Sequence, residues 1–185
     1  DDFCRELHDA RRESVQRGHA WPAWDGELYL EYHRGTLTTL GWLKRANRVA
    51  ELALRRVEYL IAASPAGNAL SVAHADALDV AWKKLLLNQF HDILPGSSIK
   101  VVYDDAHADH SAITAALGPI EREARNKCCR GADTKGMRQP MAVFNTTSWP
   151  ATGVVQIDNE LHFVEDVPAL GMRVVDRPVR DIDTS

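Results

Sequence analysis

The stretch NQFHDILPGSS, residues 88–98, brings an imidazole, a carboxylate and two hydroxyls into one short run. His91 offers a neutral ring nitrogen and Asp92 a carboxylate, which suit a metal ion or the hydroxyl groups of a ligand. The run closes a segment with a helical pattern, and an aspartate there is opposed by the negative end of the helix dipole, at a cost of about 0.3–1 kcal/mol. The pair therefore indicates a requirement other than helix stability.

Two interpretations of His91 follow from the residues alone. The imidazole can bond a spare carbonyl group at the helix terminus, or it can ligate a metal. A catalytic zinc site usually takes three protein ligands and leaves one position open. A metal site that included His91 would therefore have to be completed elsewhere.

A second dense stretch, GELYLEYHRGTLTT, covers residues 26–39. It places tyrosines and charged side chains, including His33 and Arg34, just before an expected helix start. Such a mixture suits a sugar, whose ring stacks on an aromatic side chain while its hydroxyls bond to charged groups. A strand edge with a solvated charged face, followed by Thr36 as a helix N-cap, explains the same residues.

Two further patterns have simpler structural explanations. The Asn145-Thr146-Thr147 acceptor pattern for N-glycosylation is expected to be a strand-to-turn transition. A group of histidines and aspartates spreads over more than one face of a predicted helix, so we expect a solvated surface there. Its members are Asp104, Asp105, His107, Asp109 and His110.

The elements that must position these residues are mainly helical. Apolar residues recur at spacings of three and four from Thr36 to Ala63 if Asn47 is counted in the stripe, and again from about Ser71 to Asp92. A third helix starts after Ser97 or Ser98, with Gly118-Pro119 as a kink or restart. Three long helices with short connections predict an antiparallel three-helix bundle. The predicted core comprises Leu40, Leu43, Leu54, Val57, Leu78, Trp82, Leu85, Ile99, Val102 and Ile113.

The two ends of the chain have a different character. Residues 3–17 fit a short polar helix and residues 27–32 alternate like a strand, so residues 1–35 are predicted to be an extended leader lying over the bundle of residues 36–130. After a linker, residues 131–185 form a partial β-rich region that needs a partner to cover its sheet. The fold class is therefore mainly α with a partial C-terminal β-sheet. Its predicted strands are Met141–Asn145, Val154–Ile157, Leu161–Val164 and Met172–Val175.

Composition narrows the possible classes of protein. The chain has 185 residues, a hydrophobic share of 45% and a net charge of −4 with acids and bases interspersed. We expect a soluble globular protein, cut from something longer, that binds neither nucleic acid nor membrane. Of three cysteines, two are adjacent, which gives neither a disulfide framework nor metal-ligand spacing and favours free thiols in a reducing compartment.

Three motifs together resemble one enzyme family. They are ELYLEYHRGT (residues 27–36), the helix with KRANR (44–48) and LLNQFHDILPGSSI (86–99). They closely resemble the family 38 glycoside hydrolases, the α-mannosidases, and in particular the bacterial, fungal and cytosolic branch. VFN through SWP (143–150) and VPALG (167–171) resemble the start of that family's C-terminal β domains. The resemblance implies an N-terminal β/α domain, a three-helix bundle and β-sandwich domains, in that order.

The resemblance also implies a role for each candidate residue. His91 would complete a divalent metal site, normally zinc, shared with the N-terminal domain, and Asp92 would bond hydroxyls of the mannose. His33 and Arg34 would contact substrate, although the chain departs from the family pattern nearby, at Leu37. The reaction would be a retaining hydrolysis whose nucleophile and acid/base lie in the N-terminal domain, so no catalytic residue is expected in this chain.

The expected function is accordingly that of a fragment of a metal-dependent α-mannosidase. The parent enzyme would cleave terminal α-mannosyl linkages of glycans or oligosaccharides, in the cytoplasm and as a homo-oligomer. Two other classes stay open on the sequence alone. One is a non-catalytic helical interaction module in which His91 and Asp92 are structural, and the other is a carbohydrate-binding domain without hydrolysis.

Overall fold

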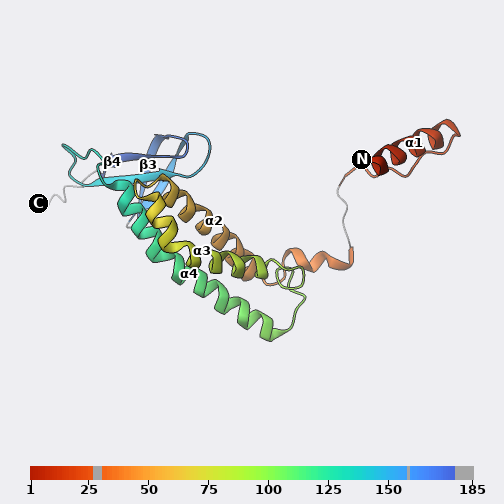
Figure 1. Cartoon of the computed structure of the whole chain (residues 1–185), viewed down its shortest axis with the longest axis horizontal. Helices are drawn as coiled ribbons and strands as arrows, with labels where there is room; N and C mark the ends of the chain where they lie inside the picture. Colours follow the sequence, from red (N-terminus) through yellow and green to blue (C-terminus); the bar gives the residue numbers. More distant parts are fainter. Residues whose placement is uncertain (27–30, 158, 178–185) are drawn as a thin grey trace, which may run out of the picture. The chain divides into compact units, whose positions relative to one another are not determined.

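The computed structural model describes residues 1–26, 31–157 and 159–177, which belong to two compact units, Asp1–Leu37 and Thr38–Ser185. The first unit contains helix α1 (Asp2–Gln16) and the 3-10 segment η1 (Glu31–Leu37). In its described residues, the second contains three long helices and four strands; Figure 1 shows their arrangement. None of the helices in the described ranges is long and apolar enough to cross a bilayer.

In the first unit, α1 confirms the predicted polar helix. It has no buried residue, and its charged side chains pair along the helix, as in Arg12 with Asp9 at 2.7 Å. The predicted strand is wrong for residues 31–32, which belong to η1, and its other residues, 27–30, lie outside the described part. Thr36 donates its hydroxyl to the carbonyl of His33 at 2.6 Å. Such local side-chain bonds favour a turn over extended backbone.

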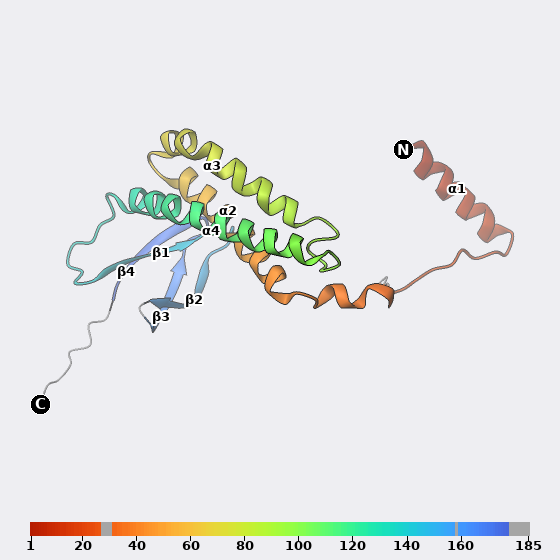
Figure 2. The same ribbon diagram turned by 90° about the horizontal axis from the view of Figure 1, so that it is seen from below.

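The three long helices share one apolar core. They are α2 (Gly41–Ala63), α3 (Gly67–Asn88) and α4 (Lys100–Cys129), and each packs against the other two (Figures 1 and 2). Their apolar stripes meet because residues three and four apart lie on one face of a helix. The central buried side chains are Leu54, Val57, Leu60, Ile61, Leu70, Ala81, Leu85, Ile113, Leu117, Ile120 and Ala124.

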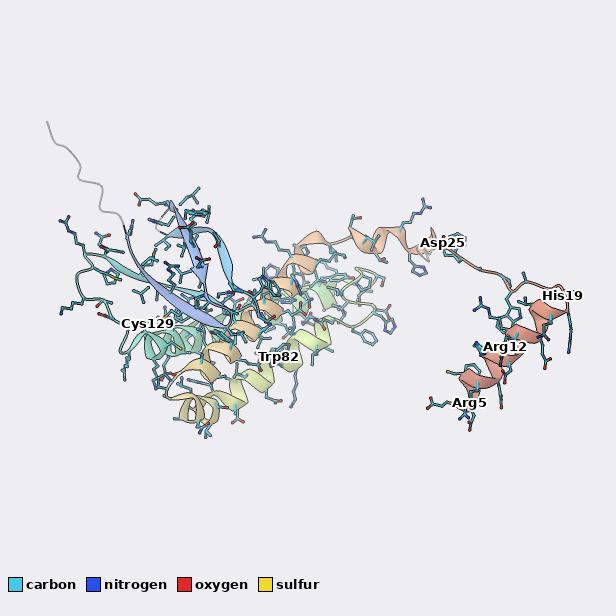
Figure 3. The ribbon with its side chains drawn as sticks, turned by 90° about the horizontal axis from the view of Figure 1, so that it is seen from above. Arg5, Arg12, His19, Asp25, Trp82 and Cys129 are labelled. Carbon is cyan, nitrogen blue, oxygen red and sulfur yellow. The ribbon has the colours of Figure 1, made fainter. Side chains whose placement is uncertain are left out.

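The predicted core is wrong for Ile99, and Leu40 is only partly buried, because both helices start later than expected. Leu40 precedes α2 in a left-handed backbone conformation, with φ 51°, and Ile99 precedes α4 with 68% of its surface exposed. Leu78, Trp82 and Val102 are only partly buried. Trp82, labelled in Figure 3, packs at the margin of the core and donates its indole N–H to Glu58 at 2.8 Å. A tryptophan needs such a polar partner, which the centre of the core does not offer.

The ends of α3 and the middle of α4 also differ from expectation. Helix α3 ends at Asn88, so Asp92 lies in the following turn and not on the helix whose dipole would oppose it. The backbone N–H groups of Gln89 and Phe90 bond three residues back, which tightens and ends the helix. Helix α4 runs through Pro119 without a restart, because Leu117 and Ile120 on either side are buried in the shared core.

Four strands form two small antiparallel sheets of two strands each. In one sheet the first strand pairs with the last, and in the other the two middle strands pair as a hairpin. All four predicted strands are present, and each is longer than predicted, by one or two residues in the first and last strands and by three or four in the middle two. They are β1 (Pro140–Asn145), β2 (Ala151–Ile157), β3 (Glu160–Val167) and β4 (Gly171–Asp176).

Asn145 confirms the predicted strand-to-turn transition. It ends β1, and its side chain is buried, donating to the carbonyls of Trp149 at 2.7 Å and Val167 at 3.2 Å. Phe144 packs against the helical core, and Arg55 of α2 donates to the carbonyl of Thr146 at 2.9 Å. The start of the β region is thereby fastened to the helices.

One buried polar side chain was expected in solvent. His110 of α4 is 7% exposed, and within the described residues neither ring nitrogen has a hydrogen-bond partner. Its neighbour Asp109 pairs with Lys84 of α3, so it is not freely solvated either. Burial is the largest effect on the pKa of His110 and lowers it from its ordinary value of 6.5. The charge of Asp109 raises this pKa, and that of His107 lowers it further.

The core assignment predicts different effects at two adjacent leucines of α3. Leu85 is fully buried and Leu86 is 57% exposed. Leu85→Ala should lower the free energy of unfolding by about 2–5 kcal/mol because it leaves a cavity. Leu86→Ala should change it by about 0.5 kcal/mol or less. Urea unfolding of both variants measures the difference, and equal losses would show that the register of α3 is wrong.

The burial of His110 predicts that acid destabilises the fold. Because its pKa is lower in the folded than in the unfolded chain, the unfolded chain binds the proton first as the pH falls through about 6.5. The contribution of neutral His110 to the free energy of unfolding is fully present above this pH and is lost progressively below it. Urea unfolding from about pH 7.5 to about pH 5 should therefore show a steeper loss for the wild type than for His110→Leu. Identical pH dependence would mean that His110 does not titrate in this range on unfolding.

Candidate functional site

The candidate site is the turn of residues 89–98, which joins α3 to α4. Its backbone closes on itself: the N–H groups of Ile93 and Leu94 donate to the carbonyl of Phe90 at 2.9 and 3.1 Å. The N–H of Gly96 donates to the carbonyl of Ile93 at 3.0 Å. These bonds make a compact loop whose first part carries His91 and Asp92.

His91 and Asp92 lie side by side on this loop and face outward. Their side chains are 77% and 57% exposed, and His91 Nε2 lies 3.5 Å from Asp92 Oδ2, too long for a strong hydrogen bond. The imidazole lies against the ring of Phe90, with the ring centroids 4.1 Å apart. Ser97 Oγ approaches Asp92 Oδ1 at 3.4 Å. The pair therefore presents an imidazole and a carboxylate to whatever binds at this surface.

The donor atoms on this turn suit one part of a metal site. A neutral imidazole is a ligand that zinc prefers, and a carboxylate can serve a metal or a hydroxylated ligand. In the described ranges, however, no three histidine, cysteine, aspartate or glutamate side chains come together as metal ligands. The turn accordingly fits a contribution to a shared site rather than a complete one.

The turn is fastened to the start of α2 by two contacts. The ammonium group of Lys44 donates to the carbonyl of Leu94 at 3.0 Å and also to the carbonyl of Thr39. Gly96 has φ +93°, and a Cβ atom built on it would lie 2.6 Å from Cγ2 of Thr39. Only glycine meets both the backbone conformation and the close approach at this position.

Contacts with α3 and α4 hold the two ends of the turn. Asn88, 1% exposed, donates its amide to the carbonyl of Lys84 at 2.8 Å and to Asp109 Oδ2 at 3.2 Å, while Lys84 and Asp109 form an ion pair. At the other end, the N–H of Ser98 donates to the hydroxyl of Tyr103 at 2.6 Å. All three long helices therefore contribute to the position of His91 and Asp92.

Sequence reasoning missed the residues that hold the turn. Lys44 and Asn88 lie within the quoted motifs, but no role followed from their types, and Asp109 was placed on a solvated surface. Lys44 meets Leu94 fifty residues away in the chain. The only signal was the occurrence of Asn88 and Lys44 inside conspicuous motifs, which does not reveal a contact at that distance in sequence.

His33 and Arg34 lie in η1 of the first unit, and both are exposed. The backbone of His33, with φ −117° and ψ 17°, interrupts the 3-10 geometry. His91 and Asp92, which are neighbours in the sequence, lie together on the exposed turn. The roles expected of His91, Asp92, His33 and Arg34 all stay predictions.

Comparison with known proteins shows the family to which the chain belongs. Residues 31–126 match the family model described as the α-mannosidase middle domain, and this range contains the whole turn. The mouse protein α-mannosidase 2C1 is 38% identical over 135 residues, which is 72% of this chain and 13% of the mouse protein. The α-mannosidase of Saccharomyces cerevisiae is 37% identical over 105 residues, or 53% of this chain and 9% of the yeast protein.

A solved structure supports the fold. The crystal structure of an α-mannosidase from Enterococcus faecalis V583 matches with a TM-score of 0.51 and 24% identity, over 68% of this chain and 14% of that chain. At this identity the likeness concerns the fold alone. The chain spans only a small part of each of these relatives. On the family model and the curated relatives, it belongs to the α-mannosidase family.

Proposed function

We propose that this chain is the central part of a metal-dependent, retaining α-mannosidase of glycoside hydrolase family 38. Its three long helices would be the antiparallel bundle of that enzyme, residues 36–130, between a leader (1–35) and the start of a β-sandwich domain (131–185). The observation that carries the proposal is the exposed His91–Asp92 pair, held by all three helices inside the range that matches the middle-domain model.

In this proposal each residue of the pair has one task. His91 supplies a neutral imidazole nitrogen to a divalent metal, zinc by preference of the ligand type. Asp92 accepts hydrogen bonds from hydroxyl groups of the terminal mannose, and His33 and Arg34 are assigned to further contacts with the substrate. When bound, the metal would hold hydroxyls of the sugar ring and help to distort it.

The hydrolysis itself is assigned to residues outside this chain. Retaining cleavage needs two carboxyl groups about 5–5.5 Å apart across the scissile bond. On this turn Asp92 is the acid, and it is committed to substrate hydroxyls. The chain covers only 13% of the length of the mouse protein. This supports the assignment of the nucleophile, the acid/base and the other metal ligands to other parts of the enzyme.

The proposal also covers the cellular setting of the enzyme. Cys4, Cys128 and Cys129 are free thiols, and burial raises the pKa of Cys128 and of Cys129, which lowers the fraction of each that is present as the reactive thiolate. Free thiols agree with the reducing cytoplasm. The substrates would be α-mannoside glycans or oligosaccharides, and a homo-oligomeric state of the whole enzyme stays a prediction.

The first test replaces His91 in the complete enzyme. Loss of a group that only hydrogen-bonds to a metal ligand typically costs about 10–100-fold in metal affinity. His91→Ala removes a ligand itself, so it should reduce metal affinity by more than this, and activity should fall with it. The fold should be unaffected because the side chain is 77% exposed. Metal content, turnover and the unfolding midpoint are measured together. The matched control is His107→Ala, an exposed histidine of α4.

Unchanged metal content and activity in His91→Ala would remove this residue from the site. That result would favour a helical interaction module. Metal-independent binding of mannosides by the complete protein, without hydrolysis, would instead favour a carbohydrate-binding domain.

The second test uses the 185-residue chain alone. We expect no hydrolysis of an aryl α-mannoside above the rate in buffer, with or without added zinc, because the two reacting carboxyl groups are assigned elsewhere. Release of the aryl group is followed by absorbance, with the complete enzyme as the positive control. Zinc-dependent turnover that disappears when Asp92 is changed to Asn would place the reacting carboxylates in this chain.

A further inference from the structure

We propose that Lys44 is the positioning residue of the His91–Asp92 pair. It would set where the imidazole and the carboxylate stand by fixing the turn to α2, without touching metal or substrate itself. This inference rests on the proposed function for its consequence in the enzyme, but the contact itself is a property of the fold.

The contact joins two segments that the sequence keeps apart. Lys44 lies in the first turn of α2, and its ammonium donates to the carbonyl of Thr39, before the helix, and to that of Leu94, in the turn. An ammonium carries three donors, and hydrogen bonds from a charged donor are stronger than neutral ones. One side chain thus holds both carbonyl groups in a fixed relation.

The partners of Lys44 distinguish it from the other lysines with described contacts. Lys83, Lys84, Lys100 and Lys127 each pair with a carboxylate. In the part of the chain that the structure describes, Lys44 instead bonds to two backbone carbonyls. A lysine that serves solubility or helix pairing does not need such partners, whereas one that fixes a loop does.

A second contact at the same place adds to the restraint. Gly96 approaches Thr39, the residue whose carbonyl Lys44 also holds. Leu94 and Gly96 flank Pro95, which fixes its own φ angle. The second half of the turn is therefore anchored by Lys44 and by this close approach, and the backbone bonds to Phe90 transmit that restraint to the first half.

The consequence is specific to the site. Groups that hydrogen-bond to a metal ligand and orient it are typically worth about 10–100-fold in metal affinity or activity. Lys44 bonds to the backbone of the turn and not to His91, so we expect an effect at the lower end of this range. Lys44→Met keeps most of the aliphatic stem of the side chain and removes the charged donors. Lys44→Arg keeps a charged donor group that can reach carbonyl oxygens.

The experiment compares Lys44→Met, Lys44→Arg and the control Lys83→Met, which breaks an exposed pair on α3. In the complete enzyme, zinc affinity is measured by competition with a chelator. The same variants are assayed for kcat and KM on an aryl α-mannoside. In the 185-residue chain, amide hydrogen exchange is measured for residues 89–98. Lys44→Met should lose about tenfold in zinc affinity and exchange faster in the turn only. Lys44→Arg should recover most of both losses, and Lys83→Met should resemble the wild type.

Two results would overturn the proposal. One is wild-type zinc affinity and wild-type exchange of the turn in Lys44→Met. The other is a loss in Lys44→Met that Lys44→Arg does not recover and that accompanies faster exchange throughout the helices, which would make Lys44 a residue of general stability. Failure of the proposed function can be told apart from failure of the Lys44 proposal. If the proposed function is wrong, His91→Ala leaves zinc affinity unchanged, while hydrogen exchange of the turn still shows whether Lys44 holds it.

Discussion

The mutual packing of three helices around one apolar core is the constraint on which the candidate site depends. The turn of residues 89–98 has no core of its own, and both His91 and Asp92 are exposed. Its place is set by where the end of α3 and the starts of α2 and α4 come together. Burial of Leu54, Leu85 and Ile113 thus determines the position of residues that never enter the core.

Polar contacts then convert this packing into a defined loop. Asn88 and the Lys84–Asp109 pair join α3 to α4 where the turn begins, and Lys44 ties its second half to α2. These groups are partly or wholly removed from water, so each must find a partner or cost free energy. Satisfying them at the helix ends is compatible with only a narrow range of loop conformations. The same requirement explains how His91 and Asp92, which face outward, can be held in one defined position.

Hydrophobic spacing predicted the mainly helical fold, the three long helices and all four strands, because that spacing directly reflects which face is buried. It did not predict the helix ends. Helix α2 begins at Gly41 instead of Thr36 and α3 ends at Asn88 instead of Asp92, since local hydrogen bonds decide termini. The His91–Asp92 pair was found from residue types in one short motif. Lys44 and the burial of His110 depend on contacts between distant segments, which no local pattern contains.

The direct test of the account is to locate the metal in the complete enzyme. Anomalous scattering at the zinc edge, from crystals of that enzyme, would place the ion independently of any activity assay. The account predicts zinc with a ring nitrogen of His91 at about 2.0–2.1 Å, the usual zinc–imidazole distance, and with its other ligands from outside residues 1–185. Zinc bound wholly by other residues, with His91 turned away, would contradict it.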